Sequence, residues 1–539
     1  MSDQISTVGV VGCGTMGSGI SEVCARAGYN VVFREIDGEA VEAGLARIQH
    51  SMERAVAKEK LSAEDRDAAL GRISGTTSYD SLKGCDLVIE AVPEKLEAKQ
   101  DLFKALDALL PDHAILATNT SSLPVIEMAV QTGRPSRVIG LHFFNPAPVM
   151  DLVELVKTVV TDPDVLEATS AFAQALGKTP VVCQDRAGFI ANLLLFPYLN
   201  NAVKMLESGF ATREDIDASM QFGTGHPMGP LALLDLIGLD SAYEILDAMY
   251  RQFRETLYAP APLIKQLVTA DFLGRKTGRG FYEYEETASP RLKEAGHHRR
   301  ETPESAAAHV KRIGILGSGT MANGIAEVVA KAGYPVVLRA RTKQRASESA
   351  AKIEKSLAKA VEKKKMTQEQ FDATRALVTT TTEMDDFADC DLIIEGIAED
   401  LEVKVDHFRR LDAVAPEHAV LASTTSSLPI ISLAAATNRP EQVIGMHFFN
   451  PAQVMKLVEV VRTVRTSDET ADTVYAVTAK VRKHAVHCSD RAGFIVNALL
   501  FPYLNDAVKM LEAGYTTAED IDNSMKLGCG HPMGPFALL

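Results

Sequence analysis

The chain has 539 residues, more than one hydrophobic core can organise, so several domains are expected. With 46% apolar and 24% charged residues, its composition is typical of a globular protein and excludes a disordered chain. The formal charge of −15 argues against a protein that mainly neutralises nucleic-acid phosphates.

No apolar run is long enough to span a membrane, and the first six residues lack the pattern of a secretory signal. We therefore expect a cytoplasmic protein with neither nucleic acid nor membrane as a partner. The seven cysteines are dispersed and contain no C-x-x-C pair, which predicts reduced thiols and no cysteine metal site.

A predicted strand at residues 7–11 leads into a glycine-rich turn and then into a helical stretch. This order lets backbone amides and a helix N-terminus face a pyrophosphate. A second apolar run at 31–33 leads to Glu35, where a carboxylate accepts hydrogen bonds from an adenosine ribose. The sequence thus predicts an NAD site in a doubly wound α/β domain of Rossmann type. The predicted turn consists of Gly12, Gly14, Thr15, Met16 and Gly17.

Two further apolar runs are predicted strands with polar residues near their ends. The first covers 85–92 and precedes a predicted helix at about 95–110. The second covers 114–118 and continues into Asn-Thr-Ser-Ser at 119–122. Polar residues at the carboxyl ends of parallel strands lie where ligands bind in open α/β sheets. Residues 119–122 are therefore a candidate ligand-binding turn, with a plain polar turn as the alternative.

A histidine and a glutamate twelve residues apart form the candidate catalytic pair. His142 closes a predicted strand at 137–141. Glu154 alternates with aliphatic residues at 152–156, and an unpaired carboxylate on such a face is costly. Histidine at a strand end is a natural partner, and the hydrogen bond would fix its tautomer so that it accepts an alcohol proton.

The remainder of this first copy is predicted to be helical. Asp185 is a predicted N-cap for a helix that runs to Glu207, with a kink at Pro197. We therefore predict a dinucleotide-binding domain at 1–184 and an all-helical domain at 185–284. Residues 285–310 have no apolar period and are interpreted as a linker.

The whole pattern then repeats at a constant shift of 305 residues, which indicates a duplication. We predict a second dinucleotide-binding domain at 311–489 and an incomplete helical domain at 490–539. Because copy two stops inside an apolar stretch, we expect the natural C-terminus to extend beyond Leu539, with a naturally short second copy as the alternative. The matching segments are 10–16 with 315–321, 141–146 with 446–451, and 226–230 with 531–535.

Copy two departs from copy one at its cofactor site. Gly17 becomes Ala322, which the motif tolerates, and Glu35 becomes Ala340. Losing the acid removes repulsion toward a 2′-phosphate, and Arg341 can pair with one, helped by a neighbouring Arg339 or Lys343. The cofactor of copy two is therefore NAD or NADP, and we hypothesise that this copy prefers NADP or binds NAD poorly. The alternative is a set of solvated surface cations beside an unused site.

Together these motifs resemble those of the 3-hydroxyacyl-CoA dehydrogenase family. The resemblance covers nearly all of copy one. It is carried by N-T-S-S-L at 119–123, H-F-F-N-P at 142–146, R-A-G-F-I-A-N at 186–192, H-P-M-G-P at 226–230 and G-R-K-T-G-R-G-F-Y at 274–282.

The resemblance implies a role for each matching residue of copy one. His142 is the general base and Glu154 its orienting partner. Ser121 and Asn192 are hydrogen-bonding groups around the substrate oxygen and the cofactor. The residues implied around the cofactor are Glu94, Lys99, Asn119 and Asn145, and those near coenzyme A are Ser51 and Lys58. Without the resemblance, a solvated helix face is the interpretation of Ser51 and Lys58.

Copy two repeats most of these residues. For proton transfer and substrate they are Ser426, His447, Glu459 and Asn497. For the cofactor they are Gly317, Gly319, Thr320, Met321, Arg341, Glu399, Lys404 and Asn450, and for coenzyme A they are Ser356 and Lys363. Asn119, however, becomes Thr424, a second departure at the cofactor site.

The resemblance implies oxidation of a (3S)-3-hydroxyacyl-CoA to the 3-oxoacyl-CoA with NAD, and no metal. It also implies dimerisation through the helical domains, as a homodimer or as a pseudo-dimer of the two copies within one chain. One alternative makes copy two a non-catalytic module that supports copy one. Another keeps the enzyme class and replaces the acyl-CoA by a sugar acid, against which Ser51 and Lys58 favour coenzyme A.

Overall fold

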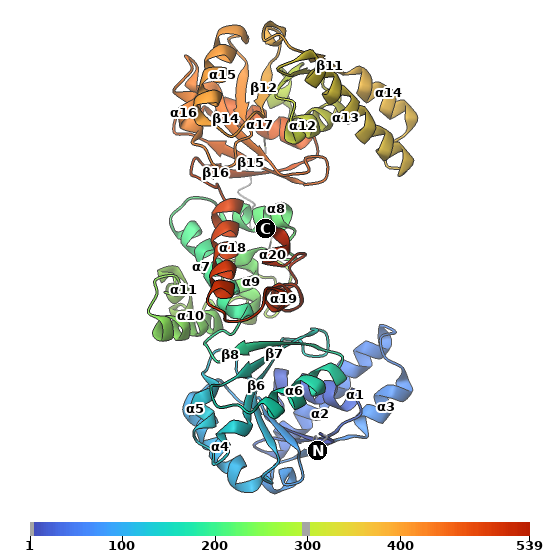
Figure 1. Cartoon of the computed structure of the whole chain (residues 1–539), viewed down its shortest axis with the longest axis vertical. Coiled ribbons are helices and arrows are strands. Elements are labelled where there is room, and N and C mark those ends of the chain that lie inside the picture. The colour runs from blue at the N-terminus through green and yellow to red at the C-terminus, as the bar shows by residue number, and fades with distance from the viewer. Residues whose placement is uncertain (1–4, 294–301) are drawn as a thin grey trace. The chain divides into compact units, whose positions relative to one another are not determined.

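The computed structural model describes residues 5–293 and 302–539 and contains two eight-stranded sheets (Figure 1). In copy one the strand order is β3-β2-β1-β4-β5-β6-β7-β8, and in copy two it is β11-β10-β9-β12-β13-β14-β15-β16. The repeated doubly wound α/β fold predicted from the sequence is therefore confirmed.

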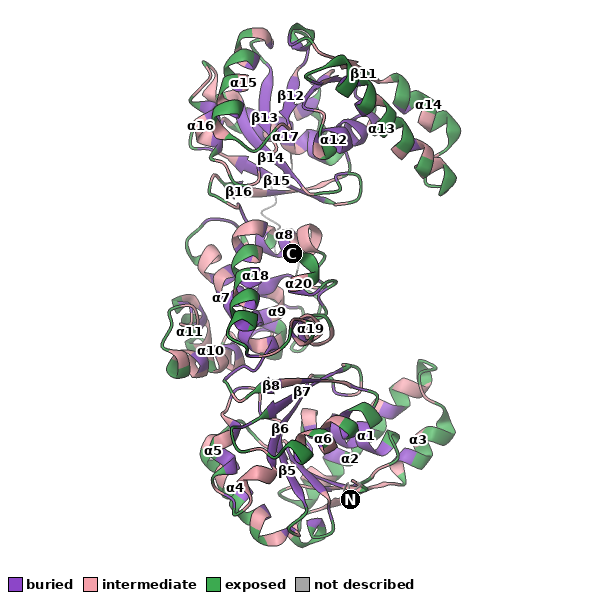
Figure 2. Cartoon of the chain, in the orientation of Figure 1, coloured by how far each residue is buried: buried purple, intermediate pink, exposed green. Residues whose placement is uncertain are grey.

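The strands of copy one are β1 (Thr7–Val11), β2 (Asn30–Arg34), β3 (Ile73–Thr76), β4 (Leu87–Glu90), β5 (Ile115–Thr118), β6 (Val138–Phe143), β7 (Leu152–Lys157) and β8 (Thr179–Gln184). Its sheet is flanked by α1 (Thr15–Arg26), α2 (Gly38–Ala57), α3 (Ala63–Leu70), α4 (Leu96–Leu109), α5 (Val125–Ala129) and α6 (Pro163–Ala175). The central strands β5 and β6 are buried along their whole length (Figure 2). Near-continuous apolar runs are what a parallel sheet covered on both faces requires.

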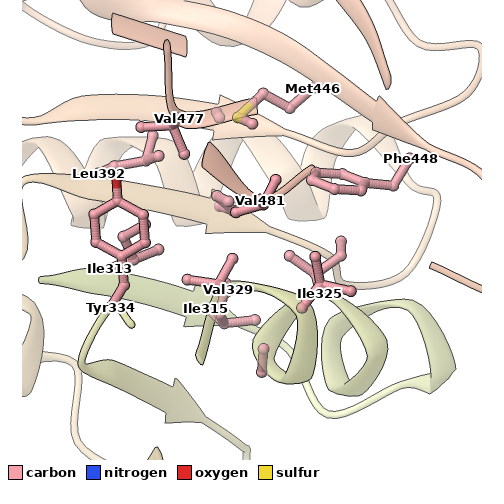
Figure 3. Packing of buried hydrophobic residues seen from close by; sticks show 14 of the residues in the cluster. Ile313, Ile315, Ile325, Val329, Tyr334, Leu392, Met446, Phe448, Val477 and Val481 are labelled. Carbon is pink, nitrogen blue, oxygen red and sulfur yellow. The ribbon is translucent and has the colours of Figure 1, made fainter. Parts of the chain in front are cut away.

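Copy two has the strands β9 (Ile313–Leu316), β10 (Val336–Arg339), β11 (Val378–Thr381), β12 (Leu392–Glu395), β13 (Val420–Ser423), β14 (Val443–Phe448), β15 (Leu457–Arg462) and β16 (His484–Ser489). Its flanking helices are α12 (Thr320–Lys331), α13 (Lys343–Glu362), α14 (Gln368–Ala376), α15 (Leu401–Val414), α16 (Ile430–Ala434) and α17 (Asp468–Lys480). One apolar cluster joins this sheet to its helices, with Ile313 and Ile315 from β9, Ile325 from α12 and Val477 from α17 (Figure 3).

The last two strands of each sheet run against the other six, because β8 is parallel to β7 and β16 is parallel to β15. β7 pairs antiparallel with β6, in a register that places His142 opposite Glu154. β15 and β14 repeat this pairing with His447 opposite Glu459. Residues directly opposite on an antiparallel pair have their side chains on one face, close enough to interact. The reversed strand is therefore what brings the two candidate catalytic side chains together.

The remaining helices of copy one are α7 (Ala191–Glu207), α8 (Arg213–Thr224), α9 (Pro230–Ile237), α10 (Leu239–Phe253) and α11 (Pro262–Thr269). Asp185 does not cap α7 as predicted. Its carboxylate accepts hydrogen bonds from the backbone N–H groups of Val125 and Ile126, at the start of α5. The predicted helix start is wrong by several residues because the intervening segment 187–190 forms turns. Pro197 lies inside α7, and the helix continues through it.

Copy two continues with α18 (Val496–Glu512), α19 (Ala518–Asn523), the π-helical turn η7 (Ser524–Gly528) and α20 (Pro535–Leu538). By its contacts, the chain divides into two compact units that do not follow the linear order of the predicted domains. Unit 1 comprises 1–200, 240–265 and 502–539, and unit 2 comprises 201–239 and 266–501.

Each unit therefore combines the sheet of one copy with helical residues of the other copy. In unit 1, the Tyr515 hydroxyl donates to the carbonyl of Gln184 at 2.7 Å, and the Thr516 hydroxyl donates to that of Val182 at 2.8 Å. In unit 2, helix α8 contacts β15 and β16, and the ring of Phe222 lies 4.8 Å from that of His484. The helical segments are thus exchanged between the copies.

Both ends of the predicted linker are packed. Residue Glu285 donates a backbone hydrogen bond to Arg291, and a 3-10 helix at Glu304–Ala307 contacts α17. Residues 294–301 of the predicted linker lie outside the described residues. Within the described chain, the cysteines are free thiols, no cluster of three metal-ligating side chains occurs, and no helix is long and apolar enough to cross a membrane.

Candidate active site

His142 and Glu154 form a buried pair at the carboxyl end of β6. The Nδ1 atom of His142 lies 2.7 Å from Oε2 of Glu154, and the glutamate side chain is fully buried. With the carboxylate accepting from Nδ1–H, the Nε2 atom keeps its lone pair free to accept a proton.

The second oxygen of Glu154 also has hydrogen-bond donors. Its Oε1 atom accepts from the backbone N–H groups of Ile190 at 3.1 Å and Ala191 at 2.8 Å, where α7 begins. The glutamate therefore satisfies orphan donors at a helix N-terminus, where negative charge is favoured. This contact compensates the burial of the carboxylate and fixes its orientation toward His142.

Two phenylalanine rings enclose the imidazole of His142. The ring of Phe144 lies 4.6 Å from it and that of Phe189 lies 5.5 Å from it, measured between centroids. Phe189 has a φ of +48°, a left-handed conformation that is uncommon for a bulky residue. Non-glycine residues held in this region cluster at active sites because the surrounding structure must compensate the strain.

A buried network of charges supports the turn that carries Ser121. Oε1 of Glu94 accepts hydrogen bonds from the Thr120 hydroxyl at 2.5 Å and from the Ser121 backbone N–H at 2.9 Å. Burial alone would raise the pKa of Glu94, but the Lys99 ammonium and these hydrogen bonds hold it below its usual range. Glu94 is therefore an anchored carboxylate that holds the turn at 120–122 in place.

Lys99 is itself buried and contacts two carboxylates rather than open space. Its Nζ atom lies 2.6 Å from Oε1 of Glu90 and 3.1 Å from Oε2 of Glu94. Glu90, at the end of β4, also accepts from the Thr118 hydroxyl at 2.6 Å and the Val92 N–H at 2.7 Å. Lys99 therefore acts on the site by positioning Glu94.

The other predicted residues of copy one lie around this pair on the loops and on α7. Oδ1 of Asn119 accepts from the Phe143 N–H at 2.9 Å, which ties the turn after β5 to β6. Asn192 is half-buried in the first turn of α7, and Asn145 is exposed two residues after β6. Ser121 is half-buried beside Glu94.

The glycine turn of copy one leaves room for a dinucleotide. A Cβ atom at Gly12 would lie 2.7 Å from the Ala91 carbonyl oxygen, and one at Gly17 would lie 1.8 Å from the Gly12 carbonyl oxygen. A Cβ at Gly14 would meet nothing within 4 Å, and no side chain caps the start of α1. Open space at the uncapped start of a helix fits a pyrophosphate.

Glu35 lies against this turn at the end of β2. Its carboxylate accepts from the Cys13 N–H at 2.5 Å and from the Ile36 N–H at 3.0 Å. Arg47, from α2, donates to the Cys13 carbonyl at 2.9 Å. The acid therefore sits beside the phosphate-binding turn, as an adenosine-ribose partner must.

Copy two reproduces the proton-transfer geometry. His447 Nδ1 lies 2.7 Å from Oε2 of Glu459, whose Oε1 accepts from the N–H groups of Ile495 and Val496. Phe449 lies 4.5 Å from the imidazole, and Phe494 has a φ of +50°. Ser426, Asn450 and Asn497 occupy the corresponding loops and helix, and Lys404 contacts Glu395 and Glu399 as Lys99 contacts Glu90 and Glu94.

The glycine turn of copy two has a different shape. Gly317 has a φ of +136°, whereas Gly12 has +89°, and the Cβ of Ala322 lies 3.3 Å from the position of an added Cβ on Gly317. Thr320 and Met321 begin α12, whose N-cap Gly319 again has no side-chain cap. The turn therefore accommodates alanine in place of the third glycine by opening at the first.

The acid of copy one has no replacement at the end of β10. Ala340 is buried, and the exposed Arg341 follows it. Thr424 replaces Asn119, and within the described residues no hydrogen bond links it to β14. Both sequence departures thus lie where a dinucleotide would contact the sheet edge.

The predicted coenzyme A residues are arranged differently in the two copies. Ser356 and Lys363, on and just after α13, line one cavity of about 760 Å³. Ser51 lies on α2 and the exposed Lys58 is its C-cap. The copy-one cavity of about 600 Å³ is lined by described residues of α1, α3 and α6 and the loops next to them, and neither Ser51 nor Lys58 is among them.

The exchanged segments reach the rings beside both histidines. In unit 1, a Cβ on Gly528 would lie 2.8 Å from Leu152 and 3.1 Å from Phe144. In unit 2, a Cβ on Gly223 would lie 2.9 Å from Leu457 and 3.6 Å from Phe449. The two glycines are equivalent under the shift of 305 residues, and each is in the copy opposite to the sheet it contacts.

Sequence reasoning missed three kinds of site residue. Glu90 was not predicted as a site residue, because a single acid at the end of an apolar strand has no distinctive sequence pattern. The left-handed conformation of Phe189 gives no sequence signal, although the glycine before it marks a turn. Gly223 and Gly528 each contact the sheet of the opposite copy, which is far away along the chain. Only these tertiary contacts identify them as site residues.

Comparison with known proteins gives a family assignment for both copies. The sequence model described as 3-hydroxyacyl-CoA dehydrogenase, NAD binding domain, matches residues 7–186 and 312–491. The model for the C-terminal domain of 3-hydroxyacyl-CoA dehydrogenase matches 188–284 and 493–539.

Individual relatives match either one copy or the whole chain. A 3-hydroxybutyryl-CoA dehydrogenase of Mycobacterium tuberculosis is 51% identical over 286 residues, which is 53% of this chain and 100% of that protein. The mitochondrial hydroxyacyl-coenzyme A dehydrogenase of Homo sapiens is 43% identical over 288 residues, covering 52% of this chain and 91% of that protein. The structure of a 3-hydroxybutyryl-CoA dehydrogenase from Escherichia coli K12 covers 99% of this chain and 91% of its own, with a TM-score of 0.69 and 27% identity.

Proposed function

The chain belongs to the 3-hydroxyacyl-CoA dehydrogenase family, and we propose that it oxidises the 3-hydroxyl of a (3S)-3-hydroxyacyl-CoA with NAD, using His142 as general base. It is an NAD-dependent dehydrogenase. The observation that carries the finer proposal is the 2.7 Å contact between His142 and the fully buried Glu154. The names of the M. tuberculosis and E. coli relatives support 3-hydroxybutyryl-CoA as a substrate.

The reaction needs a proton to leave the hydroxyl and a hydride to leave the adjacent carbon. Bound NAD supplies the hydride acceptor. In copy one, Nε2 of His142 takes the hydroxyl proton while Glu154 stabilises the imidazolium that forms. Ser121 and Asn192 donate hydrogen bonds to the oxygen as it becomes a ketone. In the reverse direction His142 returns the proton to that oxygen.

Several groups hold this machinery rather than touching substrate. The amides at the start of α7 orient Glu154, and Glu94 orients the turn that carries Ser121. The rings of Phe144 and Phe189 exclude water from one side of the imidazole. Such preorganisation is what allows a general base to act without rearrangement during the reaction.

Copy two retains the histidine, the glutamate and the same distance between them, which supports a second catalytic site. We propose that this site prefers NADP. Ala340 removes the carboxylate that would repel a 2′-phosphate, and the exposed Arg341 offers a cation at that position. If copy two uses neither NADH nor NADPH, the alternative is a module that supports copy one.

The exchanged contacts favour a pseudo-dimer of the two copies within one chain over a homodimer. Each sheet already carries a helical segment from the opposite copy, through the contacts of Tyr515 in unit 1 and Phe222 in unit 2. A pseudo-dimer is expected to have the solution mass of one chain, 58.2 kDa. Light scattering coupled to size exclusion measures this mass, and a stable species of twice that mass would favour the homodimer.

The function is tested by removing both bases. We expect the full chain to reduce acetoacetyl-CoA with NADH, and the double variant His142→Gln/His447→Gln to lose this rate at least about 100-fold. Circular dichroism and cofactor binding of the double variant serve as controls for folding. A double variant that keeps its rate within tenfold would rule out both histidines as the base.

A further inference from the structure

The cavity of copy two that contains Ser356 and Lys363 is lined by many cations. Its lining residues come from α12, α13 and α14, which Figure 1 labels, from the loop before β15 and from the end of α17. Its volume of about 760 Å³ is in the range of ligand pockets. The cationic side chains used in the argument below are Lys359, Lys363, Lys365, Lys456, Lys480 and Arg482.

Two other cations of this cavity already have partners. Lys331 forms an ion pair with Glu327, the one carboxylate among the described lining residues. Lys483 donates to the carbonyls of Ala452 and Met455, both at 2.6 Å, and burial lowers its pKa. The positive charges of these two side chains are therefore already bound within the protein, and they contribute little to the attraction of a ligand.

The remaining cations are exposed and available. Within the described chain, no ion pair involves Lys363, Lys456 or Arg482. Lys480 lies with its Nζ atom 3.9 Å above the ring of Tyr334, a contact that orients the ammonium without neutralising it. Unpaired cations converging on one concave surface attract phosphate groups.

Copy one keeps only part of this charge at the equivalent positions. Under the shift of 305 residues, Lys359, Lys363 and Lys365 correspond to Arg54, Lys58 and Lys60, whereas Lys456 corresponds to Asp151, Lys480 to Ala175 and Arg482 to Gly177. The copy-one cavity of about 600 Å³ is lined by Arg26, Arg72 and Lys178 and also by the acid Asp65. The two copies, which share their catalytic pair, therefore differ in the charge of this cavity.

The backbone conformation at Arg482 gives a second comparison between the two copies. Arg482 has a φ of +59° and its counterpart Gly177 has +74°. Glycine adopts this left-handed conformation readily, whereas arginine does so at a cost. Copy two thus places a guanidinium on the rim of the cavity at a backbone position that favours glycine.

We propose that copy two binds coenzyme A thioesters more tightly than copy one, because Lys456, Lys480 and Arg482 add contacts to the phosphates of coenzyme A. The inference rests on the proposed function and deepens it. The truncated thioester of N-acetylcysteamine carries the same acyl group and no phosphate, so it separates phosphate recognition from acyl recognition. With one tight and one weak site, the turnover rate of the wild-type chain is expected to rise with thioester concentration in two phases.

The first experiment transfers the residues of copy one into copy two. In a His142→Gln background, which leaves copy two as the active site, Lys456→Asp, Lys480→Ala and Arg482→Gly are combined. We expect KM for acetoacetyl-CoA to rise roughly tenfold, the product of a few weak charge contacts, while KM for the truncated thioester stays the same. The double variant Lys352→Asp/Lys355→Asp, on α13 but outside the cavity lining, makes the same total charge change and is the matched control.

The second experiment is the reverse transfer. In a His447→Gln background, Asp151→Lys, Ala175→Lys and Gly177→Arg are combined to give copy one the cations of copy two. We expect KM for acetoacetyl-CoA to fall several-fold. An unchanged KM in both transfers, or an equal change for the truncated thioester, would overturn the inference.

Binding of coenzyme A itself keeps this test separate from catalysis. Isothermal titration of the wild-type chain with coenzyme A is expected to give a tight and a weak site, and the Lys456→Asp/Lys480→Ala/Arg482→Gly chain only weak ones. If the His142→Gln chain binds coenzyme A at two unequal sites and still shows no turnover, that result would refute catalysis by copy two but would leave the inference about binding intact. Two equal sites in the wild-type chain would refute the inference whatever the turnover.

Discussion

The two copies agree in the geometry of the candidate catalytic pair and differ at the candidate cofactor site. His142 and His447 have the same distance to their glutamates, the same helix-start amides behind those glutamates and the same flanking phenylalanines. The glycine turns, by contrast, differ in shape, and the acid Glu35 of copy one becomes Ala340. Within one chain, the geometry of the candidate catalytic pair is thus duplicated while the candidate cofactor site differs between the copies.

The difference teaches which parts of the site tolerate change. Glu154 and Glu459 are fully buried and bonded at both oxygens, so replacing either would leave several polar groups unpaired. Position 341 is exposed on the surface, where a change of charge costs the fold little. Ligand preference can therefore differ between the copies without disturbing the proton-transfer pair.

The strongest way to separate the copies is to remove one base at a time. We expect His142→Gln to reduce NADH-dependent turnover of acetoacetyl-CoA by at least about 100-fold, because copy one is the NAD site. His447→Gln is expected to affect NADPH-dependent turnover in the same way. Steady-state rates measured with NADH and with NADPH give the loss of turnover in each variant. Equal losses with both cofactors from either variant would contradict a division of cofactors between the copies.

The exchange of helical segments predicts an effect across the copies. Gly528→Val places side-chain atoms into Leu152 and Phe144, which displaces the ring beside His142. We expect kcat of copy one, measured in a His447→Gln background, to fall about tenfold, because small misplacements of a base are costly. Gly223→Val is the matched variant and is expected to impair copy two in a His142→Gln background. If each variant impairs only the copy in which it lies, the exchange is wrong.

The cofactor difference is sharpened by restoring the acid. In a His142→Gln background, Ala340→Glu is expected to raise the ratio of NADH to NADPH activity about fivefold to tenfold, because the carboxylate repels a 2′-phosphate and accepts from a ribose. The ratio of kcat/KM values for the two cofactors measures it. Arg341→Ala is expected to weaken the binding of NADPH but not that of NADH. If neither change alters the ratio, the cations are surface charges without a role in cofactor choice.

The smallest expected effect concerns a buried aspartate in the helical region. Asp217 accepts hydrogen bonds from the Leu231 and Ala232 N–H groups and from the Tyr282 hydroxyl at 2.9 Å. In copy two, Asp522 accepts from Phe536 and Ala537. Burial raises the pKa of Asp217 to about 7. Because its folded pKa lies above its unfolded value, its contribution to stability is present in acid and is lost as the pH rises through 7.

Tyr282→Phe removes one donor to the ionised form of Asp217. We expect a loss of about 1 kcal/mol in the free energy of unfolding, larger at pH 8.5 than at pH 5.5, because the hydroxyl matters most to the charged carboxylate. Thermal unfolding at the two pH values measures it. A loss of the same size at both would mean that Asp217 does not titrate in this range.

Much of the fold was accessible from local patterns. The strand at 7–11, the glycine turn and the strands ending near 92 and 118 were predicted because apolar runs, glycines and polar strand ends are local signals. The duplication was equally plain, since one shift relates the segments of both copies. The helix start at Asp185 was wrong because its carboxylate has a distant partner, the N-terminus of α5.

The candidate site was predicted only in part, and each omission involves distance along the chain. The pairing of His142 with Glu154 was inferred from the cost of burying an unpaired carboxylate, and the structure places them in contact. That this contact arises from a reversed strand, and that Glu154 also caps α7, had no sequence signal. The assignment of catalytic roles to these residues stays a prediction until the variants are measured.

By itself the sequence determined the duplication, the repeated α/β fold, the family and the candidate pair of His142 with Glu154, because these depend on local order and residue chemistry. Only the tertiary structure decided that each sheet is covered by helices of the opposite copy, and that three cations of copy two converge on one cavity. Such features depend on which distant segments pack together, and packing sums many weak contacts that no short stretch of sequence contains.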